Sequence, residues 1–129
     1  MNTFVLPVTA LYAGVNIMLL VSLAFLVVHH RIANQVALGH NGIEALERAI
    51  RTHGNLTEYV PSGLILLALL ELNSLPGFQL YVLGGLFTFA RASHIHGMLT
   101  ATQLTRTIGA MFTVITMMAM AGQLLVLAF

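Results

Sequence analysis

The chain has 129 residues, of which 58% are hydrophobic and 7% are charged, and its mean hydropathy is +0.92. Soluble domains carry roughly 25% charged residues, so this composition excludes an ordinary soluble domain and predicts an integral membrane protein. The formal charge is +1 and cysteine is absent, so we expect no nucleic-acid partner, no disulfide framework and no cysteine nucleophile.

Four apolar runs, residues 4–28, 56–73, 78–97 and 106–128, are long enough to cross the hydrocarbon core of a bilayer as helices. The first run has no basic region before it and is longer than the hydrophobic part of a signal peptide, so we expect a retained helix. The polar connection after it contains breakers at Gly39 and Gly42, so the second helix is expected to begin near residue 43 and to project beyond the membrane or tilt.

The segment NSLPG, residues 73–77, predicts a short turn that makes the second and third helices an antiparallel hairpin. The sequence therefore predicts an all-α fold, a transmembrane four-helix bundle that forms a single domain over residues 1–129. The expected helices cover about residues 4–28, 43–73, 78–97 and 106–128. All five basic residues are arginines on the side of the first and third connections, so this side is expected to be cytoplasmic and both termini outside.

A charged helical stretch, residues 44–62, runs directly into the second apolar run. On a helix six polar residues of this stretch lie within about 60° of Arg51 and form one stripe with it: Glu44, Glu47, Arg48, Asn55, Glu58 and Ser62. Charges at membrane depth cost several kcal/mol unless they pair or face a cavity, so the stripe is a candidate binding site.

The residue types of this stripe suit a peptide-like zwitterion. Arg48 and Arg51 carry planar donors for carboxylates, Glu58 suits an ammonium group, and Asn55 both donates and accepts. The alternative for the outer part of the stripe is structural, because Glu44 with Arg48, and Glu47 with Arg51, have the (i, i+4) spacing of ion pairs that solubilise a helix end.

The third apolar run contains Arg91, which needs a partner at membrane depth. Glu58 and Glu71 are the acids at comparable depth, and a structural ion pair with one of them is the alternative to a role in binding. His94 lies about 60° from Arg91 on a helix and belongs to the candidate site, whereas His96 points elsewhere, so we expect no metal site.

Three other polar residues have competing interpretations. Arg31 and Arg106 are expected at the cytoplasmic ends of the first and fourth helices, where they serve either as topology anchors or as site residues that close over the stripe. Asn16, within the first apolar run, is expected to hydrogen-bond a neighbouring helix.

The pattern E-R-x-x-R-x-H-x-N-x-x-E-Y-x-P over residues 47–61 resembles the membrane-associated proteins in eicosanoid and glutathione metabolism, the MAPEG superfamily. Within this superfamily the chain looks like a bacterial-type member, one that resembles microsomal glutathione transferase and leukotriene C4 synthase. The resemblance implies a homotrimer of four-helix subunits in a bacterial inner membrane, with glutathione bound between subunits near the cytoplasmic face. It also implies that glutathione contacts Arg51, Asn55, Glu58 and Tyr59, with Arg31 from the first connection.

Catalytic members of this family resemble one another in a second pattern, R-x-x-Y-x-x-G-Y. This chain keeps Arg91 and Gly97 but has His94 and Met98 in place of the two tyrosines. The arginine that stabilises the thiolate in some members falls on Arg106, with Thr105 as the neighbouring alternative. A free thiol is mostly protonated at neutral pH, and a nearby guanidinium favours the nucleophilic thiolate.

Two functions follow from the resemblance, and the sequence leaves both open. One is a glutathione transferase or peroxidase that uses Arg106 and attacks an apolar electrophile entering from the lipid. The other is a non-catalytic member that binds glutathione or a lipid and regulates a partner, which would explain the missing tyrosines. A small drug exporter is disfavoured, because the first helix lacks the acid that would couple protons to transport.

Overall fold

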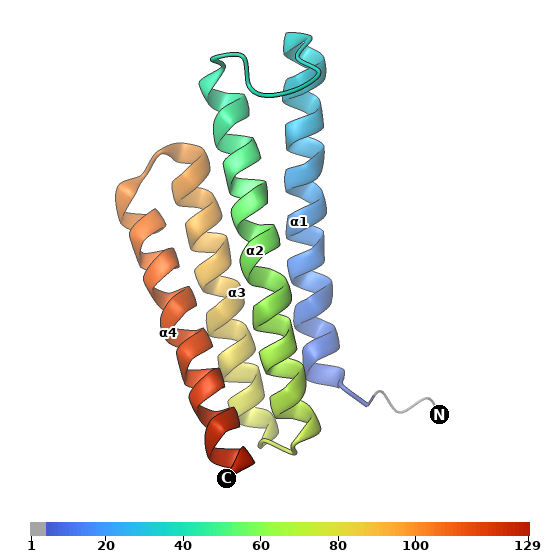
Figure 1. The fold of residues 1–129 in the computed structure, drawn as a ribbon, viewed down its shortest axis with the longest axis vertical. Helices are drawn as coiled ribbons and strands as arrows, with labels where there is room; N and C mark the ends of the chain where they lie inside the picture. The colour runs from blue at the N-terminus through green and yellow to red at the C-terminus, as the bar shows by residue number, and fades with distance from the viewer. Residues whose placement is uncertain (1–4) are drawn as a thin grey trace.

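The computed structural model describes residues 5–129 and contains, within that range, four helices and no strand (Figure 1). The helices are α1 (Pro7–Asn34), α2 (Glu44–Leu72), α3 (Gly77–Thr100) and α4 (Gln103–Ala128). α2 and α3 each contact all the other helices, whereas α1 and α4 lie on opposite sides of them without touching. The predicted all-α four-helix fold is confirmed.

The helix limits differ from the predicted ones mainly at the polar ends. The predicted start at Phe4 lies outside the described residues, and α1 continues to Asn34, six residues past its apolar run. The guanidinium of Arg31 donates from Nη1 to the carbonyls of Ala37 and Gly39 at 3.1 and 3.0 Å, so the chain leaving α1 is held by the last turn of the helix. Hydropathy alone misses such a polar continuation of a helix.

The third connection is shorter than expected. α3 ends at Thr100 and α4 begins at Gln103, so only two residues join them. Ala101 has a φ of 58°, the left-handed conformation that ends many helices. This tight link brings the start of α4 against the end of α3.

Three of the four described helices, α1, α2 and α4, are long and apolar enough to cross a membrane by length and composition. α3 is of similar length but carries Arg91, His94 and His96, which lower its hydropathy. Large apolar side chains cover the outside of the bundle, among them Met18 and Phe25 of α1, which are 70% and 71% exposed. Lipid is the environment in which such a surface is stable.

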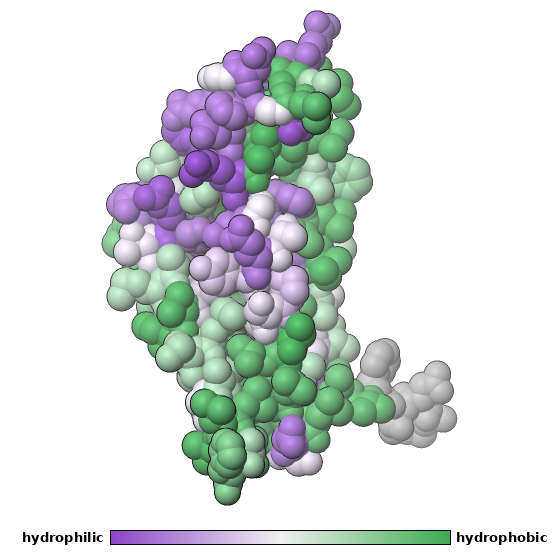
Figure 2. Space-filling view, viewed as in Figure 1, coloured by the Kyte–Doolittle hydropathy of each residue, from purple (hydrophilic) through white to green (hydrophobic). Residues whose placement is uncertain are grey.

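One end of the bundle is polar, and at the other end α1 is hydrogen-bonded to α2. α1 and α2 extend beyond α3 and α4 at the first connection, and hydrophilic residues gather there and beside it (Figures 1 and 2). At the other end the carboxylate of Glu71 accepts hydrogen bonds from the backbone N–H groups of Val8 and Thr9 at 2.9 and 2.7 Å, which satisfies orphan donors of the first turn of α1.

Halfway along the bundle, α1 is tied to α3. The side-chain amide of Asn16 donates to the hydroxyl of Thr88 at 2.8 Å, and Asn16 is fully buried. This confirms the expectation that Asn16 bonds a neighbouring helix.

Candidate functional site

A cavity of about 480 Å³ opens where the polar stripe of α2 meets the end of α3 and the start of α4. Its lining comes from all three helices: Arg51, Gly54, Asn55, Glu58, His94, Met98 and Arg106. Of the predicted site residues, the structure therefore brings Arg51, Asn55, Glu58, His94 and Arg106 to one cavity. Its volume lies in the range of typical small-molecule sites.

Two glycines allow α4 to lie directly on α3 beside this cavity. A Cβ built on Gly97 would lie 2.2 Å from the backbone nitrogen of Arg106, and one built on Gly109 would lie 2.4 Å from that of His94. Gly109 thus permits the close approach of α4 to α3. The contact at Gly97 sets where Arg106 stands relative to α2.

His94 is fixed by a hydrogen bond across the same contact. Its Nδ1 lies 3.0 Å from the backbone carbonyl oxygen of Arg106. A carbonyl only accepts, so Nδ1 must donate, which leaves Nε2 as the acceptor of the neutral ring. His94 is 8% exposed, so the ring is held on the cavity wall rather than in solvent.

The charges of the cavity lining leave two groups free for a ligand. Within residues 5–129, neither Glu58 nor Arg106 takes part in an ion pair. Arg51 pairs with Glu47 at 3.4 Å, but its side chain is 73% exposed, and such exposed pairs contribute about 0.2 to 1 kcal/mol. A ligand carboxylate can therefore compete for Arg51 at small cost.

Within residues 5–129 Arg91 does not pair with an acid, so the alternative of a structural ion pair with Glu58 or Glu71 is wrong. Its Nη2 donates to the side-chain oxygen of Asn55 at 2.7 Å, and its Cζ lies 5.1 Å from the centre of the Tyr59 ring. Glu71 sits at the far end of α2, where it caps α1 instead. Helix phase alone did not show which side chain faces Arg91, because an amide and an aromatic ring can also hold a guanidinium.

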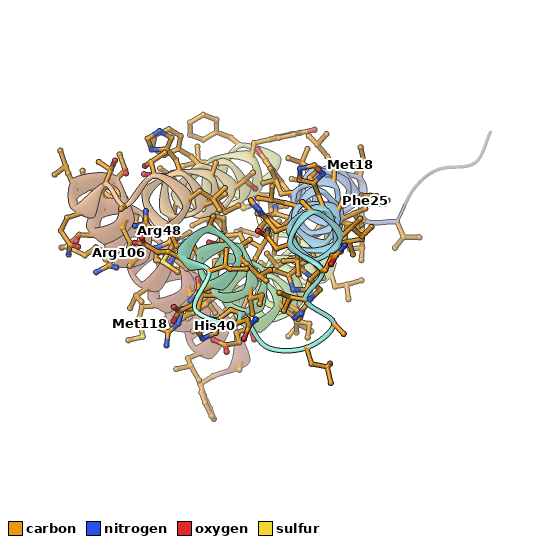
Figure 3. All side chains as sticks on the ribbon, turned by 90° about the horizontal axis from the view of Figure 1, so that it is seen from above. Met18, Phe25, His40, Arg48, Arg106 and Met118 are labelled. Atoms are coloured by element: carbon orange, nitrogen blue, oxygen red, sulfur yellow. The ribbon has the colours of Figure 1, made fainter. Side chains whose placement is uncertain are left out.

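Four predicted site residues do not line this cavity. Tyr59 and Arg91 line a small adjacent cavity, whereas Arg31 and Arg48 lie away from both within a single chain. Arg48 pairs with Glu44 on the projecting end of α2, and Arg31 bonds the first connection. The expected (i, i+4) pairs of Arg48 and Arg51 are thus confirmed. Viewed along the bundle, Arg48 and Arg106 appear on the flank opposite Met18 and Phe25 of α1 (Figure 3).

Sequence reasoning missed two contributors. Gly54 lines the cavity and lies three residues after Arg51, so the helical period that defined the stripe would have included it. Thr113 accepts a hydrogen bond from Nη1 of Arg91 at 3.3 Å, and no local signal pairs these two residues of different helices.

Comparison with known proteins supports the membrane assignment. Residues 9–126 match the sequence profile of the MAPEG family. The inner membrane protein YecN of Escherichia coli K12 is 36% identical over 90 residues, which cover 70% of this chain and 69% of YecN. YecN of Escherichia coli O6:H1, strain CFT073, matches over the same share of each chain with the same identity.

Proposed function

The chain belongs to the MAPEG family and is an integral membrane protein, and from that premise we propose that it binds glutathione and joins its thiol to an apolar electrophile. The observation that carries the proposal is the cavity that Arg51, Glu58 and Arg106 line together. Glutathione has two carboxylates, one ammonium group and one thiol. Two guanidinium groups and one carboxylate complement those charges.

Binding is assigned to the α2 side of the cavity. Arg51 takes a carboxylate, Glu58 takes the ammonium group, and Asn55 bonds the peptide backbone. Tyr59 stands one residue after Glu58 and beneath Arg91, where it closes the deep side of the site. The proposal gives Arg91 a positioning role, since it orients Asn55 through the 2.7 Å bond.

The reaction is assigned to the side of the cavity that His94 of α3 and Arg106 of α4 line. The permanent charge of Arg106 favours the thiolate over the thiol, and the thiolate is the attacking nucleophile. His94, with Nε2 as its acceptor nitrogen, is the candidate to take up the thiol proton. The sulfur then bonds the electrophilic carbon, and the electron pair displaced from that carbon leaves with a leaving group or takes up a proton. A lipophilic molecule or lipid enters from the bilayer side, because the outer surface of the bundle is apolar.

Assembly as a homotrimer is part of the proposal. Arg31 lies away from the cavity of its own chain, so it reaches a glutathione molecule only if a neighbouring subunit supplies it. In this arrangement the site lies near the cytoplasmic face, on the side that the arginines favour.

A non-catalytic binding protein is the second candidate, and one observation favours it. His94 and Met98 replace both tyrosines of the catalytic pattern, and both line the cavity. Glutathione binding without turnover across a broad panel of electrophiles would support this function and remove the transferase assignment.

Calorimetric titration of the purified protein with glutathione tests binding directly. Arg51→Ala and Glu58→Ala should each weaken affinity roughly 10- to 100-fold, the effect of losing one charge-assisted hydrogen bond. Arg48→Ala is the matched control, because it removes an arginine of the same helix outside the cavity, and its affinity should equal that of the parent. Absence of heat with the parent protein would end the glutathione proposal.

A further inference from the structure

Arg91 is a buried cation whose donors are only partly used. The residue is 1% exposed and lies in the middle of the bundle, against Asn55, Tyr59 and Thr113. Its Nε is buried and has no hydrogen-bond partner within residues 5–129. A guanidinium group stays charged under all ordinary conditions, so the charge is retained.

None of the four glutamates pairs with Arg91 within residues 5–129. Glu44 and Glu47 pair with arginines of α2, Glu71 caps α1, and Glu58 lines the outer cavity. Arg91 is 1% exposed, so the helices of its own chain keep acidic side chains of a second protein chain away from it. An uncompensated buried charge is costly unless a mobile anion balances it.

A small separate cavity of about 50 Å³ lies beside Arg91, and Asn55, Tyr59, His94 and Thr113 also line it. A single water needs roughly 10 to 15 Å³, so an ion of halide size fits. None of the lining residues is an acid.

Besides Arg91, two side chains that line this cavity have donors without a hydrogen bond within residues 5–129. The side-chain oxygen of Asn55 accepts from Arg91, so its NH₂ group keeps both hydrogens, and this group makes no hydrogen bond among those residues. The hydroxyl of Tyr59 likewise has no hydrogen bond among the described residues. A cation with unused N–H and O–H donors around a small space is the chemistry of an anion site.

We propose that this cavity binds one compact monovalent anionic group, a halide-sized ion or a single carboxylate, as the counter-ion of Arg91. The anion comes either from solution or as a carboxylate of a molecule in the outer cavity, because Asn55 and His94 line both cavities. The inference does not depend on glutathione binding or on catalysis.

The test compares thermal unfolding of the detergent-solubilised protein in sodium bromide and in sodium gluconate at equal ionic strength. Gluconate is too large for the cavity, so the midpoint should rise with bromide concentration and saturate, while gluconate gives no such rise. Tyr59→Phe, which removes one donor, should require several-fold more bromide for the same shift.

Asn55→Asp supplies a fixed carboxylate next to Arg91 and should abolish the bromide-dependent shift. Asn41→Asp is the matched control, because Asn41 is exposed in the first connection, and this variant should keep the shift of the parent. Equal midpoints for the parent in bromide and gluconate would overturn the proposal. A shift that persists unchanged in both Asn55→Asp and Tyr59→Phe would also overturn it.

Repeating the comparison with saturating glutathione separates the two sources of the anion. Loss of the bromide shift assigns the site to a carboxylate of the peptide, and an unchanged shift assigns it to a free anion. The failure of glutathione to bind is read from calorimetry, so it is distinguishable from the failure of the anion site.

Discussion

Replacement of Gly97 by alanine should separate α3 from α4 at the site. The added Cβ would lie 2.2 Å from the nitrogen and 2.6 Å from the Cα of Arg106, and both are backbone atoms that cannot rotate away. Ordinary van der Waals contact begins at 3.4 Å, so the start of α4 must retreat by about 1 Å.

This displacement should have two measurable costs. Overpacking of a close helix contact destabilises a protein by about 1 to 3 kcal/mol. The hydrogen bond from His94 Nδ1 to the Arg106 carbonyl, 3.0 Å long, would also be stretched beyond the useful range. If Arg106 serves the thiolate, a misplacement of about 1 Å should lower turnover roughly 100-fold.

Stability is measured by detergent-induced unfolding followed by circular dichroism, and turnover by glutathione conjugation to a model electrophile. Gly122→Ala, on α4, is the control, because a Cβ there meets nothing within 4 Å. Its turnover should match the parent, and its stability should equal that of the parent or exceed it by up to about 1 kcal/mol. Parent-like stability of Gly97→Ala would show that α3 and α4 do not meet as described. It would also refute the position inferred for Arg106 at the cavity.

Three further changes test separate parts of the molecule. Arg106→Ala should lower turnover more than glutathione affinity, and unchanged turnover would remove it from the mechanism. Glu71→Gln should destabilise the fold by about 1 to 2 kcal/mol, since it weakens the two bonds to the first turn of α1, and a parent-like unfolding curve would contradict that role. Glu44→Gln breaks only an exposed pair with Arg48, so its cost in the same assay should stay below about 0.5 kcal/mol, and a larger loss would mean that the pair does more than solubilise the helix end.

The helical period predicted the part of the candidate site that one helix supplies. Arg51, Asn55 and Glu58 line one cavity because their spacing places them on one face of α2, and this relation needs no tertiary information. For the same reason the pair of Arg51 with Glu47 could be read directly from its spacing.

Contacts between side chains of different helices could not be predicted from the sequence in this way. Helix phase places Arg91 on a face of α3 but does not say that Asn55 and Thr113 lie opposite it. The alternative of an acid partner therefore stayed open, where an amide and a hydroxyl occur. The approach of Arg106 to His94 depends on the contact at Gly97 and on the connection between α3 and α4. This connection has two residues, whereas the sequence pattern predicted a longer one. Helix crossing points follow from the packing of both surfaces together, and one sequence period cannot supply them.

The bonds of Glu71 to Val8 and Thr9 join residues 63 and 62 positions apart, and this separation gives the bundle an order of assembly. α1 is synthesised first, but the orphan N–H groups of its first turn have no protein acceptor until the end of α2 has been made. Until then, water at the membrane surface must accept hydrogen bonds from these N–H groups. The docking of Glu71 then releases that water and locks the first helix to the hairpin that follows it, so a truncation before Glu71 should leave α1 inserted but unattached.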